Sequence, residues 1–241
     1  FLLSEPEAGS DATSQRTTGE DKGDHYLLNG TKNWITSANL ASIYLVVVQT
    51  HPEKGHHGIN VLIVDKDTPG ITLAPHEDKM GMRSSDTHSV MFTDVKVPKE
   101  NRIGDDGFGF KFAMKALEGG RIGIAAQALG IAGGAMERAI QYSKERKAFG
   151  KLISEHQAIA FKLADMAVKI EAARNLVYKA AWLKDQGKAY GLASAIAKVY
   201  AADSAMEITT EAVQVLGGYG YVKEYHVERL MREAKLTQIY E

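Results

Sequence analysis

Cysteine is absent from the 241 residues of this chain. A chain without cysteine forms no disulfide, offers no thiolate nucleophile and binds no metal through sulfur. An excess of either charge is also missing, because 29 lysines and arginines are matched by 30 aspartates and glutamates. This balance argues against a general electrostatic binder of nucleic acid or of an anionic membrane surface.

Long hydrophobic runs are missing as well. The run from Ile43 to Val48 is far shorter than the roughly 20 residues that a membrane-spanning helix needs. We therefore expect a soluble protein. Phe1 is not an initiator methionine, and the residues after it form neither the basic nor the apolar region of a signal peptide. The start resembles the middle of a domain and the end stops on an apolar run, so we expect an internal piece of a longer protein.

Residues 1–105 alternate between apolar and polar positions and carry turn signals, which predicts an all-β domain. His25–Leu28 and Lys32–Thr36 flank Asn29-Gly30, a pair that suits a tight primed turn, so a hairpin is predicted there. A polar loop is expected at residues 51–58. Further strands are predicted at Ile43–Gln49, Ile59–Lys66, Ser89–Phe92 and Val95–Val97.

From Phe108 onward the apolar period becomes helical. One stripe has spacings of 4, 3, 4, 3 and 4 and consists of Ile159, Leu163, Met166, Ile170, Ala173 and Val177. Three long helices and a shorter one after Tyr225 are predicted, with breaks at residues 151–155 and 186–188. The expected fold is α+β and multidomain. An antiparallel, sandwich- or barrel-like β domain at 1–105 precedes an antiparallel four-helix bundle at 106–241.

The common catalytic motifs are absent: there is no G-x-S-x-G, no Walker loop and no H-E-x-x-H. The glycine-rich stretch Gly104–Gly109 lacks a βαβ context, so a strand-to-helix connector is the better interpretation. His51, His56 and His57 cluster in the polar loop but have no acidic or cysteine partner at a ligand spacing, so no metal is expected. Composition and periodicity alone therefore predict two domains and no reaction.

Seven separated segments indicate function more specifically than composition or periodicity does. They match, in this order, the patterns T/S-E-P-x-A-G-S-D, W-I-T, M-G-x-R-x-S, D/E-x-x-R, R-x-x-F-G, Q-x-x-G-G and the front of I-Y-E-G-T. The segments are Leu3–Asp11, Trp34–Thr36, Met80–Asp86, Glu118–Arg121, Arg146–Gly150, Gln214–Gly218 and Ile239–Glu241. Any one of them would be weak, but seven in register resemble the acyl-CoA dehydrogenase family. That family adds an N-terminal helical domain and the end of the last helix, which this chain lacks.

The resemblance implies an FAD-dependent α,β-dehydrogenation of an acyl-CoA in fatty acid β-oxidation. Glu241 would be the base that removes the α-proton, and flavin N5 would accept the β-hydride. Some relatives, such as isovaleryl-CoA dehydrogenases, carry the base just before the arginine of the D/E-x-x-R element. Here that position is Gly120, which cannot serve.

The resemblance also assigns binding residues. Ser10, Glu118 and Arg121 would contact the CoA substrate, with Glu118 standing where aspartate is commoner. Trp34 could alternatively be simple core. The FAD contacts implied are Phe1, Leu3, Ser4, Trp34, Thr36, Arg146, Phe149 and Gln157, together with Gln214, Gly217 and Gly218, which would approach the cofactor of a neighbouring subunit.

The implied partners are a short- to medium-chain acyl-CoA, as for butyryl-CoA dehydrogenases, and electron-transferring flavoprotein. A homo-oligomer, usually a tetramer in the family, is expected. Neither a nucleic acid nor a membrane span is expected. Bacterial cytoplasm is preferred for the absence of cysteine, with the mitochondrial matrix as the alternative. Three competing interpretations remain: an acyl-CoA oxidase-type relative using oxygen, a non-catalytic flavin- or CoA-binding scaffold, and a free-standing two-domain protein.

Overall fold

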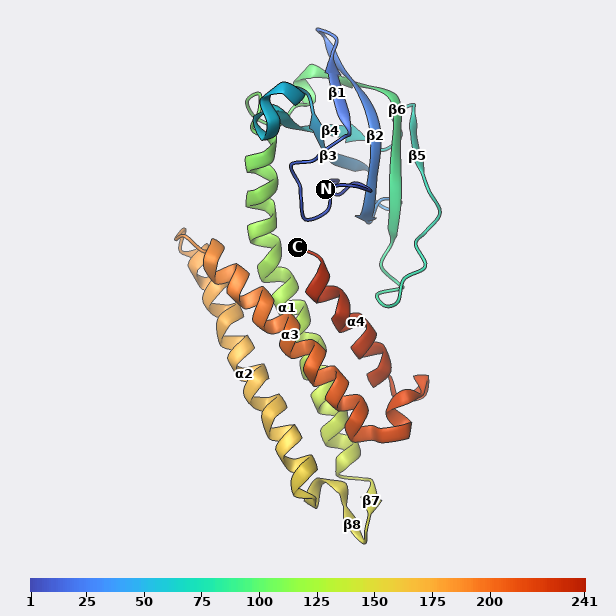
Figure 1. Cartoon of the computed structure of the whole chain (residues 1–241), viewed down its shortest axis with the longest axis vertical. Helices are drawn as coiled ribbons and strands as arrows, with labels where there is room; N and C mark the ends of the chain where they lie inside the picture. The colour runs from blue at the N-terminus through green and yellow to red at the C-terminus, as the bar shows by residue number, and fades with distance from the viewer. The chain divides into compact units, whose positions relative to one another are not determined.

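The computed structural model describes all residues from Phe1 to Glu241 and divides into two compact units (Figure 1). The first, here called the β unit, consists of Phe1–Lys79 and Arg83–Ala116. The second, the helical unit, consists of Met80–Met82 and Leu117–Glu241. The α+β fold class, with a β domain followed by a bundle of four helices, is confirmed.

The β unit is built on one six-stranded sheet with the order β4-β3-β1-β2-β6-β5. Neighbouring strands are antiparallel except β1 and β3, which are parallel, so the sheet is mixed. The predicted strands at β3 and β4 are confirmed, whereas β1 and β5 were not foreseen. The strands are β1 (Thr18–Asp21), β2 (His25–Thr36), β3 (Ile43–Gln49), β4 (Ile59–Asp65), β5 (Ile71–Leu73) and β6 (Thr87–Pro98).

The predicted hairpin at Asn29-Gly30 is wrong, because β2 continues through these residues as one strand of 12. The Asn29 amide donates to Asp94 Oδ1 at 3.1 Å, and the Asp94 backbone N–H donates to Asn29 Oδ1 at 2.8 Å. The register between β2 and β6 shifts here, and Asp94 has a φ of +49°. Asn29 thus faces a β-bulge on β6, so the two short strands predicted around that bulge are one strand.

The polar loop predicted at residues 51–58 of the β unit contains a 3-10 helix at Pro52–Gly58. The stretch Gly104–Gly109 does connect the region after β6 to a long helix, as predicted, and the Gly107 N–H donates to Asn60 Oδ1 at 2.9 Å. The core of the unit is formed by side chains of the sheet and includes two fully buried tyrosines, of which Tyr44 donates to the Ala38 carbonyl at 2.6 Å.

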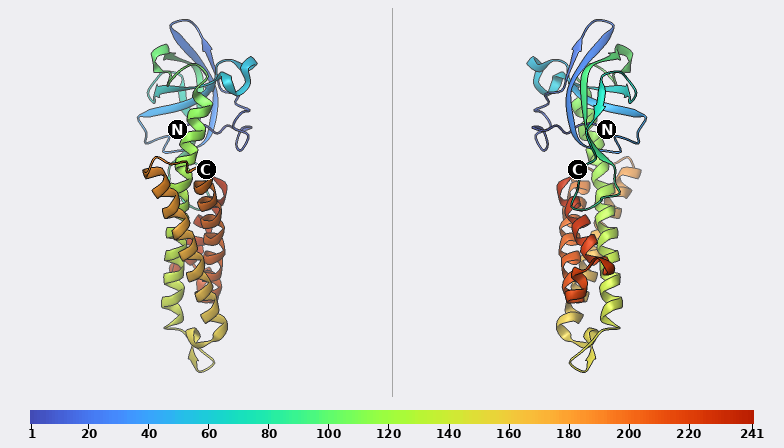
Figure 2. Two further views of the ribbon diagram at one scale, coloured as in Figure 1. Left: turned by 90° about the vertical axis from the view of Figure 1, so that its left-hand side faces the viewer. Right: turned by 90° about the vertical axis from the view of Figure 1, so that its right-hand side faces the viewer.

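The helical unit contains the predicted long helices, α1 (Gly109–Ser143), α2 (Gln157–Asp185) and α3 (Gly191–Leu216), and the shorter α4 (Val227–Ile239). Figure 2 shows them side by side in one bundle. A small hairpin, β7 (Lys147–Ala148) with β8 (Lys151–Leu152), joins α1 to α2. None of the helices has the length and apolar character to cross a membrane.

Small residues determine how closely these helices pack. The buried positions of α1 in the bundle core are all alanine, and they recur at spacings of 3 or 4: Ala125, Ala128, Ala132, Ala135 and Ala139. Alanine at such positions favours helix formation and allows close approach of neighbouring helices. Met80–Met82 joins this unit because Gly81 lies against the backbone of Arg232 in α4, where a Cβ would be 2.8 Å from the carbonyl oxygen.

Candidate functional site

Glu241 and Gly120 share one small volume in the helical unit. Tyr240 leaves α4 with extended backbone, and the Glu241 carboxylate then lies against Gly120 of α1. A Cβ on residue 120 would be only 2.7 Å from Glu241 Cδ and 3.0 Å from its Oε1. Real Cβ atoms do not approach other heavy atoms so closely. The absence of a side chain at position 120 is therefore what makes room for this carboxylate.

Glu241, the last residue of the chain, is exposed, yet its carboxylate lies against α1 near two positive charges. Burial raises the pKa of Glu241, and the charges of Arg121 and Lys198 oppose that rise. Lys198, on α3, is 9% exposed, and burial lowers the pKa of its ammonium while Glu241 counteracts this. A carboxylate with a raised pKa is a stronger base, and the nearby positive charges of Arg121 and Lys198 stabilise its ionised form.

Lys198 was not singled out from the sequence. A signal was available, because Ser194, Lys198, Ala201 and Ala205 are spaced 4, 3 and 4 apart on the buried side of α3. A lysine in an otherwise small or apolar stripe marks a buried charge that needs an explanation.

The residue before Glu241 is anchored to α1. The Tyr240 hydroxyl donates to Gln127 Oε1, and burial raises the pKa of Tyr240. The Tyr240 backbone N–H donates to Leu236 O at 3.2 Å. Gln127 is a second residue that the motifs did not reveal, and it restrains the chain just before the carboxylate.

Glu118 and Arg121 belong to the same turn of α1 as Gly120. The Glu118 carboxylate lies beside Gly191, the first residue of α3, where a Cβ would be 2.9 Å from Glu118 Oε1. Lys184 Nζ would be 3.3 Å from a Cβ on Gly119. The structure therefore brings the three predicted residues Glu118, Arg121 and Glu241 into one region of the helical unit, with two lysines added.

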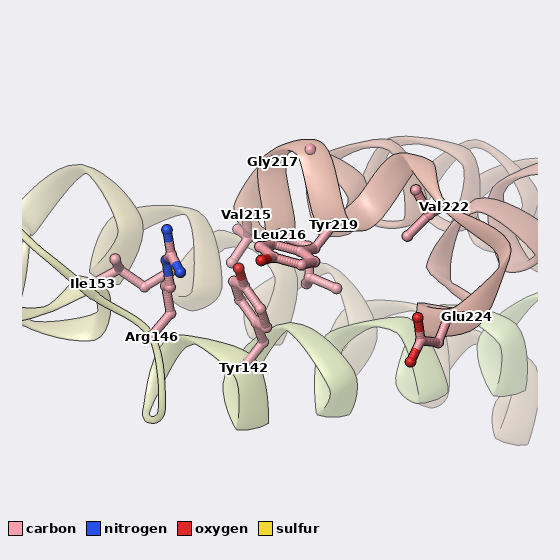
Figure 3. Close-up of a pocket in the computed structure, with 10 residues that line it drawn as sticks. Tyr142, Arg146, Ile153, Val215, Leu216, Gly217, Tyr219, Val222 and Glu224 are labelled. Carbon is pink, nitrogen blue, oxygen red and sulfur yellow. The ribbon is translucent and has the colours of Figure 1, made fainter.

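A cavity of about 700 Å³ lies elsewhere in the helical unit (Figure 3). It contains three predicted residues, Arg146, Gly217 and Gly218. The Arg146 guanidinium carbon is 5.7 Å from the centre of the Tyr219 ring, and that ring is 6.2 Å from Tyr142. The remaining lining residues are Ile153, Val215, Leu216, Val222 and Glu224.

The cavity suits a ligand with phosphate and aromatic groups. A guanidinium binds phosphate well, and tyrosine rings offer flat apolar surfaces. A Cβ on Gly217 or Gly218 would meet nothing within 4 Å, so their backbone is open to a ligand. The tyrosines were not predicted, because no short motif marks them.

Three residues predicted for the same cofactor lie outside the lining of this cavity. Gln157 and Gln214 are exposed near the start of α2 and the end of α3. Phe149 is 97% exposed at the turn between β7 and β8, has a φ of +53°, and its ring is 6.0 Å from that of His156. A phenylalanine presented in this way is available to a surface outside its own fold.

The remaining predicted cofactor residues lie in the β unit. Trp34 is 62% exposed and Thr36 is exposed, while Ile35 between them is buried, so Trp34 is not core. The Asn33 N–H donates to the Ser4 carbonyl at 2.8 Å, which places the chain start beside this strand end. The Phe1 ring is 6.4 Å from Phe112, and Ser10 is exposed.

The histidine cluster differs from its expectation in one respect. His51 Nε2 lies 3.3 Å from Asp106 Oδ2, and His51 Nδ1 lies 3.4 Å from Glu53. The fold therefore gives His51 two acidic partners that spacing did not suggest, and one of them, Asp106, comes from a distant segment of the chain. No group of three or more His, Cys, Asp or Glu side chains is arranged to hold a metal ion.

Comparison with known proteins agrees with the fold and the motifs. The family model described as acyl-CoA dehydrogenase, C-terminal domain, matches residues 107–241, and that of the middle domain matches residues 1–95. This chain belongs to the acyl-CoA dehydrogenase family. It is 56% identical over 243 residues to a short-chain specific acyl-CoA dehydrogenase of Megasphaera elsdenii, covering all of this chain and 63% of that protein.

Two solved structures are similar to this acyl-CoA dehydrogenase family member over its whole length. Butyryl-CoA dehydrogenase from M. elsdenii has a TM-score of 0.98 and 55% identity, with 63% of that chain covered. A chain from a structure described as electron transferring flavoprotein of Acidaminococcus fermentans has the same values. The chain thus spans about 63% of the length of these relatives.

Proposed function

We propose that this chain is the flavin- and base-bearing part of an FAD-dependent acyl-CoA dehydrogenase. The enzyme would convert a short- to medium-chain acyl-CoA to the trans-2-enoyl-CoA. The observation that carries the proposal is the Glu241 carboxylate in the space beside Gly120, with its pKa raised by burial. The relatives named as short-chain and butyryl-CoA dehydrogenases support the substrate class.

Glu241 would act as general base on the α-proton of the acyl thioester. An α-CH is a very weak acid, and a base works best when its pKa is close to the operating pH. Burial moves the pKa of Glu241 in that direction, and the charges of Arg121 and Lys198 oppose this rise by stabilising the ionised form. Glu118 and Arg121 would bind the CoA part of the substrate, together with Ser10.

Bound FAD would supply the acceptor for the β-hydrogen. The residues that would hold it in the β unit are Phe1, Leu3, Ser4, Trp34 and Thr36. In the helical unit, Arg146, Phe149 and Gln157 would contact FAD, and Gln214, Gly217 and Gly218 would approach the FAD of a neighbouring subunit. The exposed Trp34 fits the flat ring system of such a ligand, and the open backbone at the two glycines, beside Arg146, fits a phosphate part.

Electron-transferring flavoprotein is the proposed electron acceptor. The similarity to a chain from the A. fermentans flavoprotein structure supports it, as does 49% identity to a subunit named for a caffeyl-CoA reductase-Etf complex of Acetobacterium woodii. We place the enzyme in the bacterial cytoplasm as a homotetramer. A mouse mitochondrial short-chain relative at 48% identity keeps the mitochondrial matrix as the alternative.

The test is an anaerobic titration of the full-length protein with butyryl-CoA, followed by flavin absorbance. Wild type should bleach, whereas Glu241→Gln should bind ligand but be reduced about 10²- to 10⁴-fold more slowly. Glu233→Gln is the matched control, since Glu233 lies on α4 and pairs with Arg229. Equal bleaching by Glu241→Gln would place the base elsewhere. Peroxide formation matching substrate loss in air would favour an oxidase, and a wild type without flavin would favour a scaffold.

A further inference from the structure

A lysine lies in the interior of the β unit. The side chain of Lys32 is 0% exposed, and that of its partner Glu5 is 2% exposed. Lys32 Nζ donates to Glu5 Oε1 at 2.7 Å, to the Leu3 carbonyl at 3.1 Å and to Gln15 Oε1. An ammonium has three donors, so all of them are used inside the protein.

Glu5 is satisfied by backbone groups from a third segment. Its Oε2 accepts the Arg16 N–H at 2.6 Å, and its Oε1 accepts the Thr17 N–H at 3.1 Å. Burying two charges is costly, and apolar residues of similar size often stabilise a fold at least as well. The pair joins residues 3–5, residues 15–17 and strand β2 through directional hydrogen bonds, each of which has a defined length and angle.

The strand end that this pair anchors is strained. Trp34 has a φ of +61°, which is uncommon for a bulky residue, and lies where the register between β2 and β6 shifts from Lys32 to Ile35. Such a strained backbone conformation persists only when contacts on both sides hold it in place. On the far side of Trp34, the Ser37 N–H donates to the Asp86 carbonyl at 2.8 Å. On the near side, Lys32 and Asn33 hold the strand.

The segments that this pair holds in place carry the residues proposed to bind the flavin. Lys32 binds the Leu3 carbonyl, and the adjacent Asn33 N–H donates to the Ser4 carbonyl at 2.8 Å. Trp34 and Thr36 follow directly on the exposed side of the strand end. One buried pair thus connects both segments of the β unit that would meet the isoalloxazine ring.

We propose that Glu5 and Lys32 are positioning residues for the flavin, which hold the Leu3–Ser4 segment and the Trp34 bulge in the arrangement that binds the isoalloxazine ring. This inference rests on the proposed FAD-dependent function. Neither residue touches the cofactor in this scheme. Each acts through the backbone and side chains that it fixes.

The experiment uses the full-length, FAD-loaded protein and compares Lys32→Met, Glu5→Gln and the double variant with wild type. The measurements are FAD affinity of the reconstituted apoprotein, the visible flavin spectrum, kcat and KM for butyryl-CoA, and the melting temperature of the apoprotein. Lys99→Met is the control, because Lys99 forms an exposed pair with Asp21 at 2.7 Å in the same unit.

We expect Lys32→Met to weaken FAD binding and lower kcat by about 10- to 100-fold, with an altered flavin spectrum and little change in KM. The double variant leaves no unpaired buried charge, so its apoprotein should melt close to wild type. Its FAD affinity, spectrum and kcat should nevertheless stay impaired. Glu5→Gln retains an oxygen acceptor and should lie between wild type and Lys32→Met, and it carries the test if the other variants do not fold.

A double variant with wild-type FAD affinity, spectrum and kcat would overturn the positioning role, because the pair would then matter for stability only. Wild-type behaviour of Glu5→Gln alongside unfolded Lys32 variants would overturn it in the same way. A wild-type protein that binds no FAD, or is not bleached by butyryl-CoA, would instead overturn the proposed function, and the positioning role with it.

Discussion

At the scale of single residues, the position of the Glu241 carboxylate depends on the absence of a side chain at Gly120. The carboxylate occupies the volume that any side chain at position 120 would need. Replacement of a glycine inside a helix by alanine normally stabilises a protein by about 0.5–1 kcal/mol. At position 120, however, an added Cβ would clash with Glu241 and force its carboxylate to move away. Any gain in stability would therefore come with a loss of function.

Gly120→Ala should therefore lower kcat while leaving FAD bound, since a misplaced base loses much of its effect. A loss of about 10²-fold is expected from a displacement near 1 Å. Gly123→Ala is the matched control, because a Cβ there meets nothing within 4 Å on the same helix. Stopped-flow reduction by butyryl-CoA measures both variants. Equal rates for the two would contradict the placement of Glu241.

Lys198 should contribute to the pH at which the proposed base, Glu241, loses its proton. In the proposed mechanism the active form of Glu241 is ionised, so the rate should fall as pH drops through its pKa, which burial raises and Arg121 and Lys198 lower. Removing the positive charge in Lys198→Met raises that pKa further and shifts the acid limb of kcat/KM to higher pH. Lys198→Arg should keep the limb in place.

Lys169→Met, which removes an exposed lysine paired with Glu207, is the control for this pH profile. An acid limb that stays at the wild-type pH in Lys198→Met would show that Lys198 does not interact with the base. The same profile in Glu241→Gln should lack the limb altogether.

At the scale of strands and helices, β2 carries the main departure from expectation. Asn29-Gly30 has the composition of a tight turn, yet it continues a strand opposite a bulge. Gly30 has a φ of +144° and lies against Thr17, whose Cα would be 2.6 Å from a Cβ at position 30. Glycine is required here for close approach of a neighbouring strand segment, and no turn is involved.

Gly30→Ala should accordingly destabilise the β unit more than Gly23→Ala. Both positions have positive φ, which costs a side chain about 1–3 kcal/mol, but a Cβ at Gly23 meets nothing within 4 Å. The clash with Thr17 adds about 1–3 kcal/mol. Urea unfolding measures the difference in the free energy of unfolding. Equal losses of unfolding free energy in Gly30→Ala and Gly23→Ala would mean that backbone strain from positive φ alone explains both destabilisations.

At the scale of the whole molecule, α3 leaves an apolar row uncovered. Leu192, Ile196 and Val199 are exposed at spacings of 4 and 3, so they lie on one side of the helix. Leu192 and Ile196 also line a groove of about 230 Å³ with Leu176 and Leu183 of α2. A continuous exposed apolar row of this kind is typical of an interface between proteins.

We expect this row to be covered by another copy of the chain in the proposed tetramer. Ile196→Glu places a charge in the row and should lower the oligomeric mass of the full-length protein, measured by analytical ultracentrifugation. Leu40→Glu, at an exposed position of the β unit, is the control and should leave the mass unchanged. An unchanged mass for Ile196→Glu would exclude this face as the interface.

Much of this molecule follows from local sequence. The helical period predicted the bundle, because the stripe from Ile159 to Val177 records which side of α2 faces its neighbours. The motifs located Arg146, Gly217 and Gly218, which share one cavity, and Glu241, which meets Gly120. In each case the information lies within a few residues of the feature that it predicts.

Other features were decided by tertiary structure. Lys32 looks like an ordinary surface lysine in the sequence, and its burial depends on Glu5 and Gln15, which lie far away in the chain. The same holds for Asn29-Gly30, whose conformation is set by pairing with β6. Local propensity determines which backbone conformations a segment can adopt. Burial and strand pairing depend on residues far away in the chain, and these select among the conformations that the sequence allows.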